Sequence, residues 1–147
     1  MAALQANRKK YKTPKTVQIY RDLEQLLSWE ADLLNRLPNA KGFQLLGEEI
    51  FRSTRESLAL SDLASKTGNR EAKLSLITAV GVHLNIITTH IRSLRTLSKG
   101  PNSPRVLTEK QHLHFIEMMN KISFQQFSWS EKYSQRSDPN QESSPND

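Results

Sequence analysis

The sequence predicts an all-α protein, folded as an antiparallel, up-down-up-down four-helix bundle. Apolar residues recur three and four positions apart in four separate segments, which is the spacing of one helix face. Stretches that contain proline or glycine separate these segments, and none of the segments has the pattern of a β-strand. Four amphipathic helices with short connections favour such a bundle. The length of 147 residues suits one domain with its own core.

The first two helices are predicted over about residues 15–37 and 43–65. In the first helix, isoleucine and leucine form the core stripe, and Glu30 lies in the middle of it. Because a buried carboxylate needs a partner, we expect an ion pair between Glu30 and an arginine of a neighbouring helix. The core seam of the second helix consists mostly of small residues, which would let another helix approach closely. This seam comprises Phe43, Gly47, Ile50, Thr54, Ser57, Ser61 and Ala64.

The third helix is predicted over about residues 70–98 and has two apolar seams. One seam is enough to close a four-helix bundle, so the second indicates surface buried between subunits of a homo-oligomer. The alternative is a broad core face on a monomer. His83 and His90 lie on the second seam, either as a pH-sensitive pair or as satisfied, half-buried polar groups. The first seam comprises Ile77, Val80, Leu84, Ile87, Ile91 and Leu94, and the predicted interface residues are Ala79, His83, Ile86, His90, Trp29 and Trp129.

The fourth helix is predicted to open with a capping box formed by Thr108 and Gln111. With this helix the bundle spans residues 16–136. A basic arm, residues 1–15, precedes the bundle, and an acidic tail, residues 137–147, follows it. The composition of both ends predicts disorder. The side chains that the fourth helix is expected to bury are Phe115, Ile116, Met119, Ile122, Phe127 and Tyr133.

Positive charge is the strongest functional signal in the sequence. The net charge is +6: the arm carries +5, the tail −3 and the bundle the remaining +4. Residues 73–105 contain no Asp or Glu, and three cations of this stretch would share one helix face. Such a stripe indicates a polyanionic partner, RNA and possibly DNA, held through its phosphates with little base selectivity. The alternative is a solvated face that only keeps the protein soluble. The candidate binding residues are Arg92, Arg95, Lys99, Arg105, Lys41, Lys9, Lys10, Lys12 and Lys15.

Other classes of function have little support in the sequence. The chain has no cysteine, which excludes disulfides and thiolate metal sites and favours a reducing, cytoplasmic location. The first residues lack the apolar core of a signal peptide, and the apolar stretch 74–87 is too short and polar to predict a membrane span. Glu109 and His112 form the single Glu-x-x-His motif, and a di-iron bundle needs two. We therefore expect no enzyme activity, no cofactor and no metal site.

Two stretches carry a resemblance to a known family. They are residues 37–45 (LPNAKGFQL), between the first two helices, and residues 91–97 (IRSLRTL), followed by a proline-containing loop and Leu107-Thr108. With these stretches, residues 16–135 resemble the accessory variability determinant (Avd) proteins of diversity-generating retroelements. They are also similar to the wider four-helix-bundle family encoded by ribosomal-RNA intervening sequences. Residues 57–64 (SLALSDLA) depart from the Ser-Ile-x-x-Asn-Ile-Ala-Glu-Gly signature of that wider family, which favours the retroelement branch.

The resemblance implies a ring-shaped homopentamer with a basic surface. It also implies a non-enzymatic accessory role, in which the protein binds the reverse transcriptase and template RNA or cDNA during mutagenic retrohoming. Arg95 matches an arginine of the family's basic surface near the end of the third helix, and Arg92 is a near match. The alternative function is a helical protein–protein adaptor whose basic face binds an acidic protein.

Overall fold

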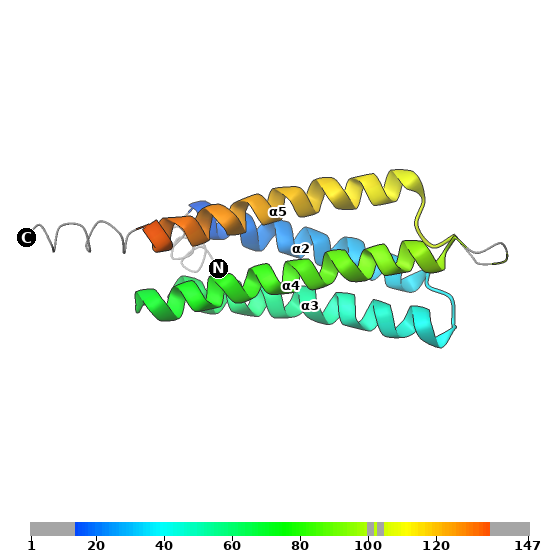
Figure 1. The fold of residues 1–147 in the computed structure, drawn as a ribbon, viewed down its shortest axis with the longest axis horizontal. Helices are drawn as coiled ribbons and strands as arrows, with labels where there is room; N and C mark the ends of the chain where they lie inside the picture. The colour runs from blue at the N-terminus through cyan, green and yellow to red at the C-terminus, as the bar shows by residue number, and fades with distance from the viewer. Residues whose placement is uncertain (1–13, 100–101, 103–104, 136–147) are drawn as a thin grey trace, which may run out of the picture.

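The computed structural model describes residues 14–99, 102 and 105–135, and these residues form four α-helices and no β-strand (Figure 1). The prediction of an all-helical, four-helix protein is confirmed. The predicted disorder of the arm and tail concerns residues outside this description. The exceptions are residues 14 and 15 of the predicted arm, which belong to the first helix. The helices are α2 (Pro14–Asn35), α3 (Lys41–Lys66), α4 (Arg70–Leu97) and α5 (Glu109–Gln135).

The four helices lie side by side, and each packs against two others. α3 contacts α2 and α4, and α5 contacts α4 and α2. The α2–α3 and α4–α5 connections lie at one end of the bundle, and the α3–α4 connection lies at the other (Figure 1). A hydrogen bond links the α2–α3 connection to the α4–α5 connection, because Arg36 donates from Nη1 to the carbonyl oxygen of Val106 at 3.1 Å. Residues that are far apart in the sequence therefore lie close together at this end of the bundle.

The starts of α4 and α5 follow from local side-chain chemistry. The predicted capping box is confirmed: Gln111 donates its backbone N–H to Thr108 Oγ1 at 3.1 Å, and Thr108 donates its own N–H to Gln111 Oε1 at 2.9 Å. At the start of α4, Asn69 accepts the backbone N–H of Ala72 at 2.9 Å. These bonds satisfy amide groups that have no partner within the helix. They fix where α5 begins, and hence where the side chains of its first turn lie.

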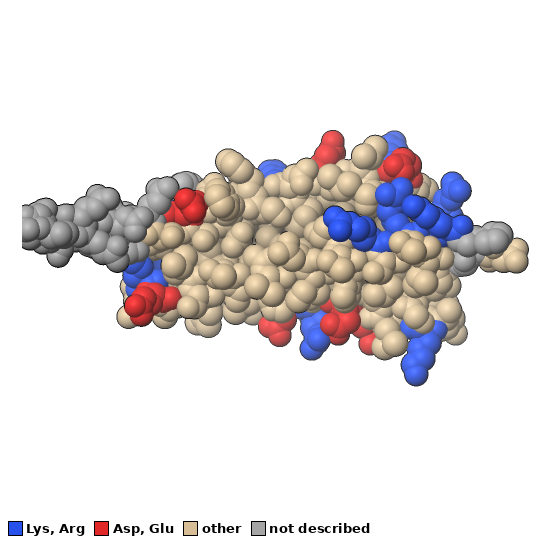
Figure 2. All heavy atoms as spheres, in the orientation of Figure 1, with Lys and Arg blue, Asp and Glu red and all other residues tan. Residues whose placement is uncertain are grey.

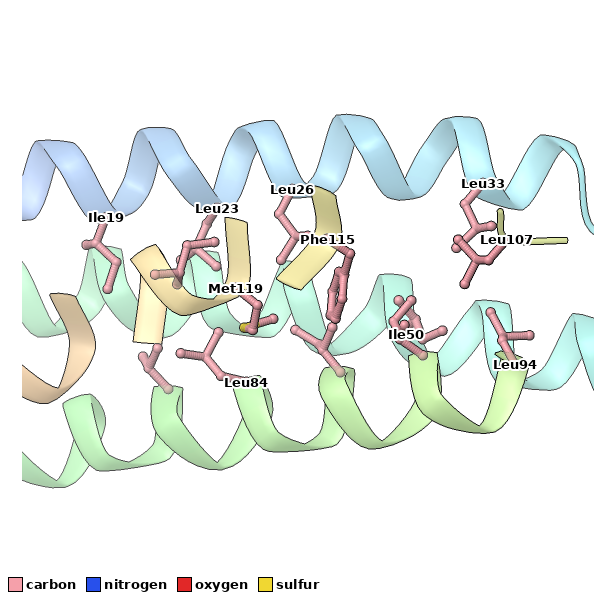
Figure 3. Close-up of a cluster of buried hydrophobic side chains, with 14 of the residues drawn as sticks. Ile19, Leu23, Leu26, Leu33, Ile50, Leu84, Leu94, Leu107, Phe115 and Met119 are labelled. Carbon is pink, nitrogen blue, oxygen red and sulfur yellow. The ribbon is translucent and has the colours of Figure 1, made fainter. Parts of the chain in front are cut away.

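The core lies along the bundle axis and receives side chains from all four helices (Figure 3). The predicted first seam of α4 is buried throughout, and so are the small residues of the α3 seam. In α5, Phe115, Met119 and Ile122 are buried as expected. The prediction was wrong for Ile116 and Phe127, which are exposed. These two positions are three helical turns apart and share a face that is turned away from the face of Phe115 and Ile122.

Glu30 is fully buried, but its partner is a hydroxyl group instead of an arginine. Thr54 Oγ1 lies 2.6 Å from Glu30 Oε2, and the other carboxylate oxygen has no hydrogen-bond partner among the described residues. Within the same residues no cation pairs with Glu30, so the expected ion pair was wrong. Burial raises the pKa of the Glu30 carboxyl to about 8, although the Thr54 hydrogen bond lowers it. Glu30 is therefore mostly protonated at pH 7.

Candidate nucleic-acid interface

Basic side chains gather at the end of the bundle where the α4–α5 connection lies (Figure 2). Arg92 and Arg95 lie in the last turns of α4, and Lys99 follows this helix. Arg105 precedes α5, and Lys41 begins α3. The start of α3 adjoins the end of α4, since a Cβ atom at Gly42 would lie 3.9 Å from Leu97 Cδ1. The structure thus brings five predicted residues to one end. We call this group the basic end: Lys41, Arg92, Arg95, Lys99 and Arg105.

Arg95 is the most constrained cation of the basic end. Its Nη2 atom lies 2.9 Å from Glu109 Oε2, and its Nη1 atom lies 3.2 Å from His112 Nδ1. A guanidinium group has no acceptor, so His112 accepts through Nδ1 and carries its proton on Nε2. Burial is the largest cause that lowers the pKa of His112; Arg95 and Arg92 also lower it, and Glu109 opposes them. His112 is therefore a neutral acceptor at pH 7.

The other four cations of the basic end are exposed and differ from Arg95 in one respect. Within the described part of the chain, the side chains of Arg92 and Lys99 form no hydrogen bond or ion pair, and the same holds for the side chains of Lys41 and Arg105. Elsewhere on the surface, Arg52 pairs with Glu49 and Lys66 with Asp62. The predicted acid-free stripe is thus partly compensated, because folding brings Glu109 back onto Arg95. Its remaining cations stay uncompensated among these residues.

Of the predicted lysines of the arm, the structure describes only Lys15. Lys9, Lys10 and Lys12 lie outside the described residues. Lys15 lies in the first turn of α2, at the opposite end of the bundle (Figure 1). Arg36, by contrast, reaches the basic end and donates to Gln111 Oε1 at 3.3 Å as well as to Val106. Its contacts hold α2 against the α4–α5 connection.

The predicted interface residues have mixed environments. Trp129 belongs to the core of the bundle, and Trp29 is half-buried with its ring stacked on Phe115 at 5.5 Å between centroids. The four predicted residues of α4 are all half-buried. The Nδ1 atoms of His83 and His90 are buried without a hydrogen-bond partner among the described residues. The α4 residues and Trp29 thus leave part of their surface uncovered, whereas Trp129 packs inside its own bundle.

Sequence reasoning missed the most exposed apolar surface. Phe124 is 71% exposed and Phe127 is 59% exposed, and Leu113 and Ile116 lie exposed on the same outer face of α5. We call these four residues the outer stripe of α5. On α4, Val82 is 54% exposed, and residues 74–91 contain no charged residue. The spacing of positions 113, 116, 124 and 127 carries a helical signal, but it does not reveal which of several apolar faces of α5 meets the core.

Two further observations bear on partners. The described residues contain no group of three or more His, Asp or Glu side chains placed to hold a metal ion. By length and composition alone, α4 is apolar enough to cross a membrane, a property it shares with core helices of soluble proteins. Comparison with known proteins gives no match to any family model, curated protein or solved structure.

Proposed function

We propose that the protein is a non-catalytic nucleic-acid-binding subunit whose basic end holds phosphate groups of RNA or cDNA. The observation that carries this proposal is the cluster of Arg92, Lys99 and Arg105, which have no carboxylate partner among the described residues, around the partly compensated Arg95. Like charges held together repel one another and do not stabilise a fold. Phosphate groups of a polynucleotide would relieve this repulsion, with release of bound counterions.

The resemblance to the Avd proteins supplies the proposed setting. In that setting the subunit binds a reverse transcriptase together with its template RNA in the cytoplasm, and an antiparallel bundle is the building block of a homopentameric ring. The outer stripe of α5 and the uncharged α4 surface support the assembly part of the proposal. The four side chains of the stripe expose on the order of 400 Å² of apolar surface, which is within the range of functional patches. The middle of the face in Figure 2 shows no charged atoms.

Nucleic-acid binding is tested first by salt dependence. Four cations that contact a single strand predict a slope of about −3 in a plot of log K against log salt. Affinity for a single-stranded RNA 20-mer should then fall by about 60-fold between 50 and 200 mM salt. Fluorescence anisotropy with a labelled 20-mer measures both quantities. A wild-type protein that binds neither RNA nor DNA at 100 mM salt would contradict the proposal and favour an adaptor for an acidic protein.

Charge reversal tests the position of the site. The double variant R92E/R95E should lose RNA binding while its circular dichroism remains helical. Because Arg95 also contacts His112, a second variant, R92E/K99E, changes two exposed residues that have no described partner. The matched control is R52E/R55E, which makes the same charge change on exposed α3 positions. If both variants of the basic end bound RNA as the wild type does, the assignment of the site would be wrong.

Self-association is tested by solution mass. The variants V82D and F124D/F127D place carboxylates on the apolar surfaces of α4 and α5, and they should shift the particle to the mass of one chain. The control A59D introduces the same charge at an exposed position of α3. Light scattering coupled to size exclusion, at 10 to 100 μM protein, gives the masses. A wild-type protein with the mass of a single chain over this range would contradict the proposed assembly.

A further inference from the structure

We propose that Glu109 is a built-in competitor of nucleic acid at the basic end. Its carboxylate holds Arg95, and a phosphate group must displace it before Arg95 can contribute to binding. This inference rests on the proposed function and adds a residue that sets its affinity. The juxtaposition is a product of folding, because Glu109 is the first residue of α5 and Arg95 lies fourteen positions earlier, in the last turn of α4.

The geometry shows an arginine whose two terminal nitrogens already have protein acceptors. Nη2 donates to Glu109 at 2.9 Å and Nη1 donates to His112 at 3.2 Å. Carboxylate and phosphate oxygens are both good acceptors for this donor fork, so they compete for the same nitrogens. His112 is neutral at pH 7, so it carries no charge that competes with an incoming phosphate group. Glu109 is therefore the contact that a phosphate oxygen replaces.

Exposure indicates that this replacement is easy. The side chain of Glu109 is 68% exposed and that of Arg95 is 31% exposed, so water reaches the pair. Ion pairs of this kind contribute little to stability and open readily. The capping box of Thr108 and Gln111 holds the start of α5 independently of the Glu109 side chain. The bridge can thus open without loss of the helix end.

The neighbouring cations explain how a polynucleotide wins this competition. Arg92 is close enough to affect His112, and neither it nor Lys99 pairs with a carboxylate in the described residues. A strand that binds these residues places further phosphates beside Arg95 at a high effective concentration. A single phosphate group lacks that advantage. Glu109 thus weakens binding of isolated anions and leaves the site to polyanions.

The test compares E109Q with E49Q, because Glu49 forms a surface bridge with Arg52 at the same 2.9 Å. Glutamine keeps the size of the side chain and removes its charge. In the anisotropy titration with the RNA 20-mer, E109Q should bind about threefold to tenfold more tightly than the wild type. Its salt slope should match that of the wild type, because a bound strand contacts Arg95 in both proteins and the number of phosphate contacts is therefore the same. E49Q should match the wild type in both measurements.

A double-mutant cycle separates direct competition from the general effect of one removed negative charge. In the R95Q background, E109Q should change the dissociation constant by less than about twofold, since the contested arginine is absent. An equal gain with and without Arg95 would overturn the competitor role, and so would an E109Q protein that binds no more tightly than the wild type. If the wild type bound no RNA, the proposed function would fail and this inference with it. If it bound RNA and the cycle showed no coupling, only the inference would fail.

Discussion

Glu30 gives the sharpest test of the fold's energetics, through the variant E30Q. The carboxyl group is fully buried, and its pKa is raised from the ordinary 4.5 to about 8. Thr54 Oγ1 lies 2.6 Å from Glu30 Oε2 and 3.2 Å from the carbonyl oxygen of Ile50. A hydroxyl group has one proton, so it cannot donate to both oxygens at once. Thr54 therefore donates either to Glu30 or to Ile50, and its bond to Glu30 opposes the larger effect of burial on the pKa of that carboxyl.

The expected magnitude follows from proton linkage. Between pH 4.5 and 8 the folded protein keeps the Glu30 proton and the unfolded chain does not, so the free energy of unfolding falls as pH rises. The contribution of Glu30 is fully present below pH 4.5 and is lost as pH rises through 8. Each pH unit inside this window costs about 1.4 kcal/mol. Between pH 5 and pH 8 the loss amounts to about 3.5 kcal/mol.

Urea unfolding followed by circular dichroism measures this loss. With a denaturant dependence of about 2 kcal/mol per molar, the wild-type midpoint should fall by about 1.7 M relative to E30Q between pH 5 and pH 8. The comparison with E30Q cancels His112 and other groups that titrate in both proteins. The control E24Q changes an exposed glutamate of α2 and should retain the wild-type slope. Parallel curves for wild type and E30Q would refute the view that Glu30 is buried in its protonated form.

Three other perturbations test packing and polar contacts by the same urea assay. T54V should move the wild-type inflection to higher pH, because the Thr54 hydrogen bond lowers the pKa of Glu30. G47A should destabilise the fold by about 1 kcal/mol despite the better helix propensity of alanine, since a Cβ atom there would clash with Leu37. The control G42A should not destabilise the fold, because its Cβ atom would make only an ordinary contact with Leu97. D22A should cost about 1–3 kcal/mol, because buried Asp22 accepts a 2.6 Å hydrogen bond from Gln125; unchanged stability would contradict that role.

The sequence predicts those parts of the fold that depend on short-range pattern. The prediction of the buried α4 seam was correct because positions such as Ile77, Val80 and Leu84 recur at helical spacing over several turns. The capping box was correct because three residues contain its whole chemistry. The α5 face was partly wrong because apolar residues surround much of this helix. Periodicity then leaves open which face meets the core, and packing decides against Phe127.

The candidate site was predictable in its composition but not in its pairing. The acid-free run ends before Glu109, so local spacing gives Arg95 no partner. The loop between α4 and α5 returns the chain and brings Glu109 within 2.9 Å of Arg95. The same limit applies to Glu30, whose partner Thr54 lies on the next helix and carries no charge. Long-range neighbours of a polar group depend on the relative rotation of helices, which the pattern of one helix does not specify.

The separation of charge from apolar surface links the two parts of the proposed function. The basic end lies at the tip of the bundle, whereas Val82 of α4 and Phe124 of α5 lie along its length. Contacts between subunits along their lengths leave the tips free. In a cyclic assembly with its axis along the bundle, all tips lie on one rim. Under the proposed competition each cluster would bind weakly by itself, because Glu109 holds Arg95, and the rim would derive its affinity from repetition along one strand. In the proposed function, weak single sites and self-association would be complementary parts of one mechanism.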